Sequence, residues 1–272
     1  MRAIKWFVLL ACWPMISWSL ELGEQIEYRK SVMKTLDEGV VAYRSALQLG
    51  ASRAEIAKHL KVLALTSGQI KAAFEPRVDG GYAKADVWKK WADFSRRADT
   101  QSAKFAQLSE LAASGVLSPI NPDPTSALGC VACHNAYRLP VESRVASAPR
   151  SPVGTDPVAY RQQIMRVIDA QTSAIGQILA GTVSEDGFAS HLEVVSLMAS
   201  VAFAAFERGP PGGASLPNVW NEKTNFLGAM QEFSDNALKA SRIARQNGKD
   251  AAAVAVIDAL PCRQCHDVYR RK

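Results

Sequence analysis

The sequence is poor in histidine and cysteine, and it lacks the patterns of β-strands. Histidine occurs four times and cysteine five times among 272 residues. Alternating runs of β-branched or aromatic residues are missing, which excludes a β-rich fold. After the first nineteen residues, no stretch is long and apolar enough for us to predict a membrane helix. A globular chain of this length is expected to form two domains.

The first nineteen residues have the order of a secretory signal peptide. A basic start at Arg2 and Lys5 precedes an apolar run from Trp6 to Trp18, and small residues end the segment. We therefore predict a signal peptide over residues 1–19 and a periplasmic mature protein. The alternative is a lipoprotein anchored at Cys12, because the residues leading to Cys12 resemble a lipoprotein cleavage box. The apolar run continues past Cys12, which favours the signal peptide.

One offset relates the two halves of the chain. Two Cys-x-x-Cys-His motifs end at His134 and His266, which are 266 − 134 = 132 residues apart. Such a register, kept without a gap, indicates a tandem duplication. The same offset pairs these further landmarks: Tyr28-Arg29 with Tyr160-Arg161, Met33 with Met165, His59 with His191, Phe74-Glu75 with Phe206-Glu207, Val87-Trp88 with Val219-Trp220, Phe94 with Phe226, and Tyr137-Arg138 with Tyr269-Arg270.

A proline-rich segment separates the two copies. Residues 140–157 contain four prolines, a composition typical of an extended, semi-rigid linker. We therefore expect one domain over residues 20–139 and a second over residues 158–272.

Apolar residues recur at three- and four-residue steps through each copy, which predicts amphipathic helices. In the first copy we expect helices ending near Gly50, spanning about 52–74, and running from Asp86 to about Ala113. The fourth helix carries the cysteine motif. Gly129 and Pro261 precede its first cysteine and predict a bend or a helix start there. Four such helices per copy predict an all-α fold of two tandem antiparallel four-helix bundles.

Each cysteine motif has the residues needed to attach one haem c covalently. The first is Cys130-Val-Ala-Cys133-His134 and the second is Cys262-Arg-Gln-Cys265-His266. Two thiols can add to the vinyl groups of a haem while the histidine ligates its iron. Residues three apart share one side of a helix, so the spacing suits this chemistry. We therefore expect two covalent haems, one in each domain.

Zinc is the alternative cofactor, because cysteine and histidine also ligate zinc and His59 would complete a four-ligand set. Adjacent cysteine and histidine strain a tetrahedral site, which favours haem. The formal net charge of +6 becomes 6 − 2 = +4 without Arg2 and Lys5, and four haem propionates would offset the remainder. We therefore expect no nucleic-acid partner.

The order of the motifs within each copy resembles the cytochrome c′ family. Tyr-Arg-x-x-x-Met lies in the first predicted helix, Trp-x-x-x-x-x-Phe in the third, and Cys-x-x-Cys-His-x-x-Tyr-Arg ends the domain. The resemblance implies a four-helix bundle that holds haem between its helices. The site roles it implies are proximal iron ligands at His134 and His266, distal methionines at Met33 and Met165, propionate partners at Arg29 and Arg161, and basic residues bordering the proximal pocket at Arg138 and Arg270.

The distal residue decides between two functions. If the sulfur of Met33 or Met165 ligates iron, the haem is six-coordinate and low-spin, and the chain carries electrons between redox partner proteins. This is the function we favour, without enzymatic turnover. If the sulfur does not ligate, the iron is five-coordinate and the resemblance implies binding of nitric oxide or carbon monoxide. Iron ligation by His59 and His191 is a further alternative.

An enzymatic alternative and the mode of assembly complete the expectations. A di-haem peroxidase is disfavoured, because those enzymes carry their haem motifs early in the domain and no acid–base cluster is recognisable here. Members of the resembled family often dimerise through their first two helices. We therefore expect either a homodimer or pairing of the chain's own two domains.

Overall fold

The computed structural model of the protein describes residues 13–116, 129–140 and 153–271. Over these residues the regular elements are all helices, and the β-type contacts are two isolated bridges. The predicted class, an all-α fold with two tandem four-helix bundles, is confirmed. Residues 1–12 of the predicted signal peptide lie outside the described residues, as do the prolines that precede Thr125 in the first copy.

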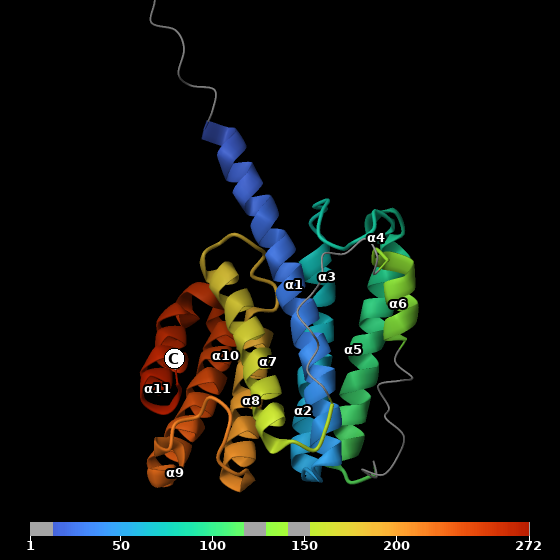
Figure 1. The fold of residues 1–272 in the computed structure, drawn as a ribbon. Coiled ribbons are helices and arrows are strands. Elements are labelled where there is room, and N and C mark those ends of the chain that lie inside the picture. Colours follow the sequence, from blue (N-terminus) through green and yellow to red (C-terminus); the bar gives the residue numbers. More distant parts are fainter. Residues whose placement is uncertain (1–12, 117–128, 141–152, 272) are drawn as a thin grey trace, which may run out of the picture.

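The two copies supply matching sets of helices (Figure 1). Repeat 1 contains α1 (Trp13–Gln48), α2 (Arg53–Gly68), α3 (Ile70–Phe74), α4 (Asp86–Lys89), α5 (Trp91–Ala113) and α6 (Cys130–Tyr137). Repeat 2 contains α7 (Pro157–Leu179), α8 (Phe188–Arg208), α9 (Asn218–Asn221), α10 (Lys223–Ala259) and α11 (Cys262–Tyr269). The short helices α4 and α9 introduce α5 and α10, and α6 and α11 carry the cysteine motifs.

Two of the predicted helices are interrupted. The helix expected over about 52–74 stops at Gly68 and resumes as α3, and the N–H of Gln69 donates to the carbonyl of Thr66 at 3.0 Å in a tight turn. Glycine is a weak helix former, and α8, which has Ser200 at the matching position, is unbroken. The third helix divides at Lys90, whose φ of −119° and ψ of 39° are repeated almost unchanged at Glu222. The second break therefore belongs to both bundles.

The predicted helix starts at the cysteine motifs are confirmed. α6 begins directly after Gly129, whose φ of 73° lies in the left-handed region that glycine tolerates. α11 begins after Leu260 and Pro261, which are not helical. α10 extends to Ala259, just upstream of Pro261, but Gly248 breaks it with a φ of 84°. Each motif is thereby carried on its own short helix.

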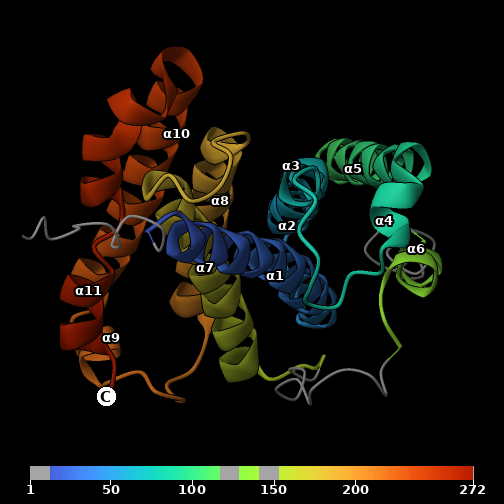
Figure 2. The ribbon, with the colours of Figure 1, turned by 90° about the horizontal axis from the view of Figure 1, so that it is seen from above.

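The first two helices of the repeats pack against each other. α1 lies along α7, and α2 contacts α8, so the four helices form a common centre with the remaining helices outside it. Figure 2 shows α5 and α6 on one side of this centre and α10 and α11 on the other. The expected pairing of the chain's own two domains is therefore present within one chain.

Two tyrosine–histidine pairs cross this interface and are related by the repeat. The Tyr28 hydroxyl lies 2.8 Å from Nε2 of His191, and the Tyr160 hydroxyl lies 2.8 Å from Nε2 of His59. Adding 132 to Tyr28 gives Tyr160, and subtracting 132 from His191 gives His59. Reciprocal contacts of this kind define an interface with approximate two-fold symmetry.

A buried polar chain satisfies both nitrogens of His191. Gln171 donates from Nε2 to the Thr35 hydroxyl at 2.8 Å, and Thr35 donates to the Ser31 carbonyl at 2.9 Å. The Gln171 oxygen is thereby left to accept from Nδ1 of His191 at 2.8 Å. His191 then carries its proton on Nδ1, and its Nε2 accepts from the Tyr28 hydroxyl.

The matching position in repeat 1 lacks this amide. Subtracting 132 from Gln171 gives Gly39, and among the described residues Nδ1 of His59 has no hydrogen-bond partner. His59 is nevertheless 1% exposed. The two halves of the interface therefore differ in how fully they satisfy their buried histidine.

The Tyr28→Phe and Tyr160→Phe substitutions are each expected to lower the free energy of unfolding by ~1–3 kcal/mol. Each removes a hydroxyl and leaves a buried histidine nitrogen without its partner. Denaturant titration of the holoprotein measures the loss. Tyr269→Phe is the matched control, because no hydrogen bond to its hydroxyl is present among the described residues, and it should cost less than ~0.5 kcal/mol. Equal losses in all three variants would contradict the assigned hydrogen bonds.

Helix α8 is apolar around most of its circumference. It is long and apolar enough to cross a membrane by length and composition, and 61% of its most apolar window is buried inside the protein. The prediction that no segment after residue 19 reaches that apolarity is therefore wrong. The physical reason is that α8 packs against α10, α7 and α2 together, and a helix enclosed by others is hydrophobic on all sides.

Candidate functional site

The two cysteine helices are docked on their repeats in the same way. At the end of α6, Lys84 N–H donates to the Tyr137 carbonyl at 2.9 Å, and at the end of α11, Leu216 N–H donates to the Tyr269 carbonyl at 2.9 Å. Antiparallel bridges, Ala83 with Arg138 and Ser215 with Arg270, follow directly. Each motif therefore lies on a short helix fastened at its C-terminal end to the loop before α4 or α9.

Few protein contacts hold the rest of these helices. Tyr137 is the buried residue of α6, and none of the residues of α11 is buried. Aromatic rings provide the main packing: Tyr137 meets Phe94 with ring centroids 5.2 Å apart, and Tyr269 meets Phe226 at 5.0 Å. Phe94 and Phe226 are the phenylalanines of the Trp-x-x-x-x-x-Phe motif in the third predicted helix. Short helices with so few buried residues depend on a further group for their order.

Among the described residues, the four motif cysteines form no disulfide bond. Cys130, Cys133 and Cys265 are partly buried and Cys262 is exposed, and Cys130 accepts a hydrogen bond from Nε2 of Gln101 at 3.1 Å. Burial raises the pKa of the thiols of Cys133, Cys262 and Cys265. Since each pair is spaced i and i+3 on its helix, the thiols can serve one ligand.

The motif histidines, His134 and His266, are exposed on α6 and α11. Burial of part of the His266 ring lowers its pKa, and the charge of Arg270 lowers it further. A neutral imidazole is the form that binds a metal. His266 therefore fits the role of an iron ligand.

The structure brings no zinc-type set together. Among the described residues, no group of three or more His, Cys, Asp and Glu side chains is placed to hold a metal ion. His59, the residue that would complete a Cys₂His₂ set, is hydrogen-bonded to Tyr160 in the interface between the repeats. His191 is bonded in the same way to Tyr28. These contacts occupy the two histidines that the sequence offered as alternative ligands.

Met33 and Met165 lie on the first helix of their repeats and are partly buried at the edge of the core. On α7, Asp169 follows Met165 by one helical turn, and the negative charge of Asp169 contributes to raising the pKa of the Cys262 thiol, after burial.

Arg29 is buried, and its guanidinium is held by the loop that follows α3. Its Nε, Nη1 and Nη2 groups donate to the carbonyls of Ala73, Val78 and Pro76 at 3.0, 2.7 and 2.6 Å. Burial lowers its pKa to about 10. The same side chain lies over the rings of Phe74 and Trp88.

Arg161 is less completely bonded than Arg29. Its Nη2 donates to the Pro210 carbonyl at 2.8 Å, while the buried Nη1 has no hydrogen-bond partner among the described residues. The indole N–H of Trp220 is also unpartnered, whereas Trp88 donates to the Phe74 carbonyl at 2.7 Å. Two buried donors without acceptors fit an anionic group such as a haem propionate.

A shallow cavity of about 400 Å³ lies beside Trp220. Its lining includes Ser215, Asn221 and Arg271, so most of its polar groups can donate hydrogen bonds. The residues of repeat 2 therefore fit a cofactor that carries carboxylates. Arg138, at the equivalent end of repeat 1, has its guanidinium 5.8 Å from the ring centroid of Tyr82.

Sequence reasoning missed one group beside the first motif. Asp93 of α5 accepts from the Tyr137 hydroxyl at 2.5 Å and from Nε of Arg97 at 2.6 Å. The i, i+4 spacing of Asp93 and Arg97 was visible in the sequence as a helical ion pair. Its position next to the cysteine helix depends on how α6 packs, which the spacing does not give.

Comparison with known proteins gives the family of the chain. The cytochrome c′ family model matches twice, at residues 24–138 and 156–270, which are again offset by 132. A cytochrome c′ of Alcaligenes xylosoxydans xylosoxydans is 29% identical over 120 residues, which are 43% of this chain and 94% of that protein.

Solved structures of the same kind are also similar. The nitric oxide complex of a cytochrome c prime variant from Alcaligenes xylosoxidans matches with 28% identity and a TM-score of 0.40, over 44% of this chain and 99% of that one. A carbon monoxide-bound variant matches with 29% identity and a TM-score of 0.39, over 43% of this chain and 94% of that one. The two family matches span most of the chain, one in each repeat, and the chain therefore belongs to the cytochrome c′ family, whose members bind haem c.

Proposed function

We propose that this chain is an exported electron carrier with one covalent haem c in each repeat. Cys130 and Cys133 hold the first haem and Cys262 and Cys265 hold the second, with His134 and His266 as iron ligands. When bound, each haem supplies an iron that accepts and returns one electron. The repeated docking of α6 and α11 supports two equivalent attachment sites.

The distal side of each site is assigned to the first helix of the repeat. Met33 and Met165 are partly buried at matching positions on α1 and α7. The matched docking of the two cysteine helices is the observation that carries the proposal. A thioether ligand raises the reduction potential of haem, as suits an electron carrier.

The remaining residues orient and neutralise the cofactor. The unpartnered Nη1 of Arg161 and indole N–H of Trp220 can donate to a propionate of the second haem. Arg29 keeps two of its five N–H groups beyond the three bonded to loop carbonyls, so it can bind a propionate of the first haem while holding that loop. Arg138 and Arg270 border the proximal side.

The packing of α1 on α7 joins the two sites. Since these helices carry the distal methionines and are locked by buried tyrosine–histidine pairs, the repeats form one unit with a fixed arrangement. A fixed pair of haems suits relay between a protein donor and a protein acceptor. No catalytic turnover is required of the chain in this role.

Replacing Met165 with leucine is expected to convert the second haem from low-spin to high-spin. Leucine keeps the apolar volume and removes the sulfur. Optical and EPR spectra of the oxidised protein, followed by carbon monoxide addition after reduction, measure the change. Leu192→Met, a change of similar size in the core of α8, is the control and should leave the spectra unaltered.

Gas binding is the second candidate function, and one finding favours it. The similar solved structures include complexes with nitric oxide and with carbon monoxide. If both haems of the unaltered protein are high-spin when oxidised and bind carbon monoxide readily when reduced, the methionines do not ligate iron. The chain would then be a gas-binding protein. Turnover of peroxide with a reduced donor would instead indicate a peroxidase.

Export is part of the proposal. We assign residues 1–19 as a signal peptide, so that the mature chain starts at Leu20 in the periplasm, where haem c is attached. Helix α1 begins at Trp13 and continues past this point (Figure 1). N-terminal sequencing of the mature protein checks the assignment. A lipid-modified N-terminus at Cys12 would replace it with the lipoprotein alternative.

A further inference from the structure

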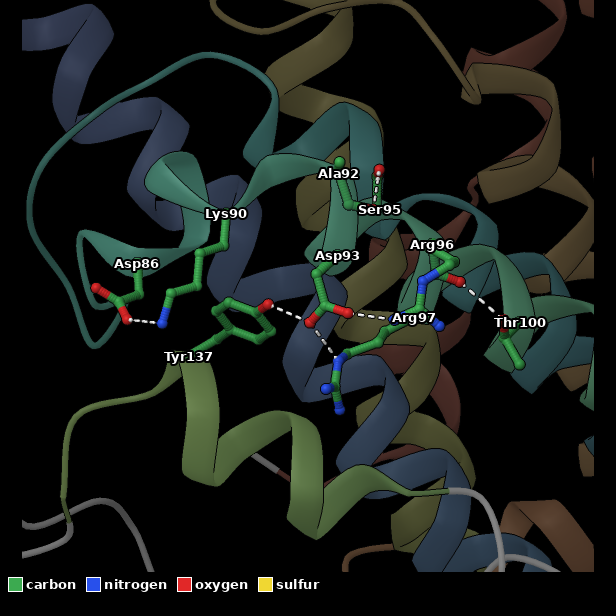
Figure 3. Close-up of polar contacts among 9 residues, drawn as sticks. All are labelled: Asp86, Lys90, Ala92, Asp93, Ser95, Arg96, Arg97, Thr100 and Tyr137. Atoms are coloured by element: carbon green, nitrogen blue, oxygen red, sulfur yellow. Dashed lines mark hydrogen bonds and ion pairs between the residues drawn. The ribbon is translucent and has the colours of Figure 1, made fainter.

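The two cysteine helices differ in the charges that surround them. In repeat 1, Asp93 of α5 is ion-paired with Arg96 and Arg97, and Figure 3 shows the Tyr137 ring of α6 pointing to the Asp93 carboxylate. Hydrogen bonds from Tyr137 and Arg97 lower the pKa of Asp93 to about 2, so the carboxylate is ionised. The cluster therefore contains one negative and two positive charges.

The cluster reaches the haem-attachment residues. Tyr137 lies one turn beyond His134 on the same helix, and Gln101, one turn beyond Arg97, donates to the sulfur of Cys130 at 3.1 Å. The guanidinium carbon of Arg97 lies 6.0 Å from the centroid of the Tyr137 ring. A positive charge is thus placed beside the helix that carries the first motif.

Repeat 2 lacks this cluster entirely. Adding 132 to the residue numbers of repeat 1 gives neutral residues at the positions of Asp93, Arg96 and Arg97. At the position of Lys90 it gives a carboxylate. The replacements in repeat 2 are Asn225 for Asp93, Gly228 for Arg96, Ala229 for Arg97, Leu216 for Lys84 and Glu222 for Lys90. The charged side chains on α11 itself are Arg263 and Asp267, which form an ion pair at 3.5 Å and add no net charge to that helix.

We propose that the Arg97–Asp93–Tyr137 cluster makes the haem of repeat 1 the higher-potential site, so that the first electron taken up by the chain resides mainly in repeat 1. This inference rests on the proposed function, because it needs a haem in each repeat. Oxidised haem carries one more positive charge than reduced haem, so a nearby cation destabilises the oxidised form and raises the potential. The direction of electron transfer within the chain then runs from repeat 2 to repeat 1.

Arg97 acts at a distance from the iron and is a positioning and tuning residue. Its side chain is 39% exposed and that of Asp93 is 35% exposed. Solvent and salt therefore screen the charge, and the effect on the potential should shrink as ionic strength rises. Tyr137 fixes the carboxylate, which in turn fixes the guanidinium beside α6 (Figure 3).

Spectroelectrochemical titration of the full-length holoprotein tests the proposal. Two substitutions are compared, one that removes a positive charge and one that removes a negative charge. Arg97→Gln should shift one of the two one-electron components to lower potential, and Asp93→Asn should shift the same component to higher potential. The other component should stay in place in both variants. The transplanted set Asn225→Asp, Gly228→Arg and Ala229→Arg, which carries one net positive charge as the repeat 1 cluster does, should raise the component that the first two variants leave unchanged.

If Arg97 and Asp93 only support the packing of α6, the titration gives a different result. Damage to the packing of α6 would move the potential in the same direction in Arg97→Gln and Asp93→Asn, and that outcome overturns the inference, as does a titration in which neither variant moves a component. If the protein contains fewer than two haems, the proposed function itself fails, which haem quantitation before the titration reveals separately.

Discussion

Replacing Cys262 and Cys265 with alanine is expected to halve the covalent haem of the chain. The two thioether bonds of repeat 2 are lost, while Cys130 and Cys133 are unaffected on a separate helix. Because α11 buries no residue of its own and is fastened mainly at its last turn, loss of the haem should also free most of this helix. Haem quantitation after denaturation measures the first effect, and amide hydrogen exchange of residues 262–269 measures the second.

The mirror substitution in repeat 1 provides the matched control. Alanine at Cys130 and Cys133 should leave the haem of repeat 2 in place and increase exchange over α6, where Tyr137 alone is buried. If either double substitution removed all the haem, attachment at the two motifs would be interdependent. If either left the haem content unchanged, the motif concerned would not be an attachment site.

Acidification from pH 7 to pH 4 is expected to destabilise the interface between the repeats by ~3 kcal/mol for each of two histidines. Burial lowers the pKa of both His59 and His191 from 6.5 to about 4. Below pH 6.5 the unfolded chain takes up protons at these residues, and the folded chain does so only near pH 4. The stabilising contribution is therefore complete above pH 6.5 and is lost as the pH falls through about 4.

Denaturant unfolding of the holoprotein at several pH values measures this loss. The variant with His59→Gln and His191→Gln cannot take up these protons, although it keeps an amide that can bond to the tyrosines. It should lose less stability than the unaltered protein over the same pH range. All other titratable residues are the same in both proteins, so the difference between the two curves isolates the interface. Parallel curves would show that the buried histidines do not link stability to pH.

Much of the architecture could be predicted because its signals are local in the sequence. The 132-residue offset, the helical steps of apolar residues and the two Cys-x-x-Cys-His motifs are each visible without knowledge of packing. Gly129 and Pro261 gave the starts of the cysteine helices correctly, since both disfavour helix at a definite position. The break after Gly68 was missed, because one glycine inside a long apolar pattern is usually tolerated.

The interface and the surroundings of the motifs could not be predicted in the same way. Tyr28, His59, Tyr160 and His191 were visible as repeated landmarks, but their pairing across the repeats depends on α1 lying along α7. Two of the three carbonyls that hold Arg29, those of Pro76 and Val78, come from a loop whose path the sequence does not specify. The sequence shows Gly39 in repeat 1 where repeat 2 has Gln171. That this difference decides whether a buried histidine nitrogen has a partner is visible only in the structure.

The mass of the intact mature protein, measured under denaturing conditions, tests the central claim most directly. Denaturation releases any haem that is held only through its iron, so the measured mass counts covalent haem alone. We expect the mass of residues 20–272 plus two haem groups, one for Cys130 and Cys133 and one for Cys262 and Cys265. A mass that corresponds to the bare polypeptide, or to a single haem, would contradict a di-haem protein.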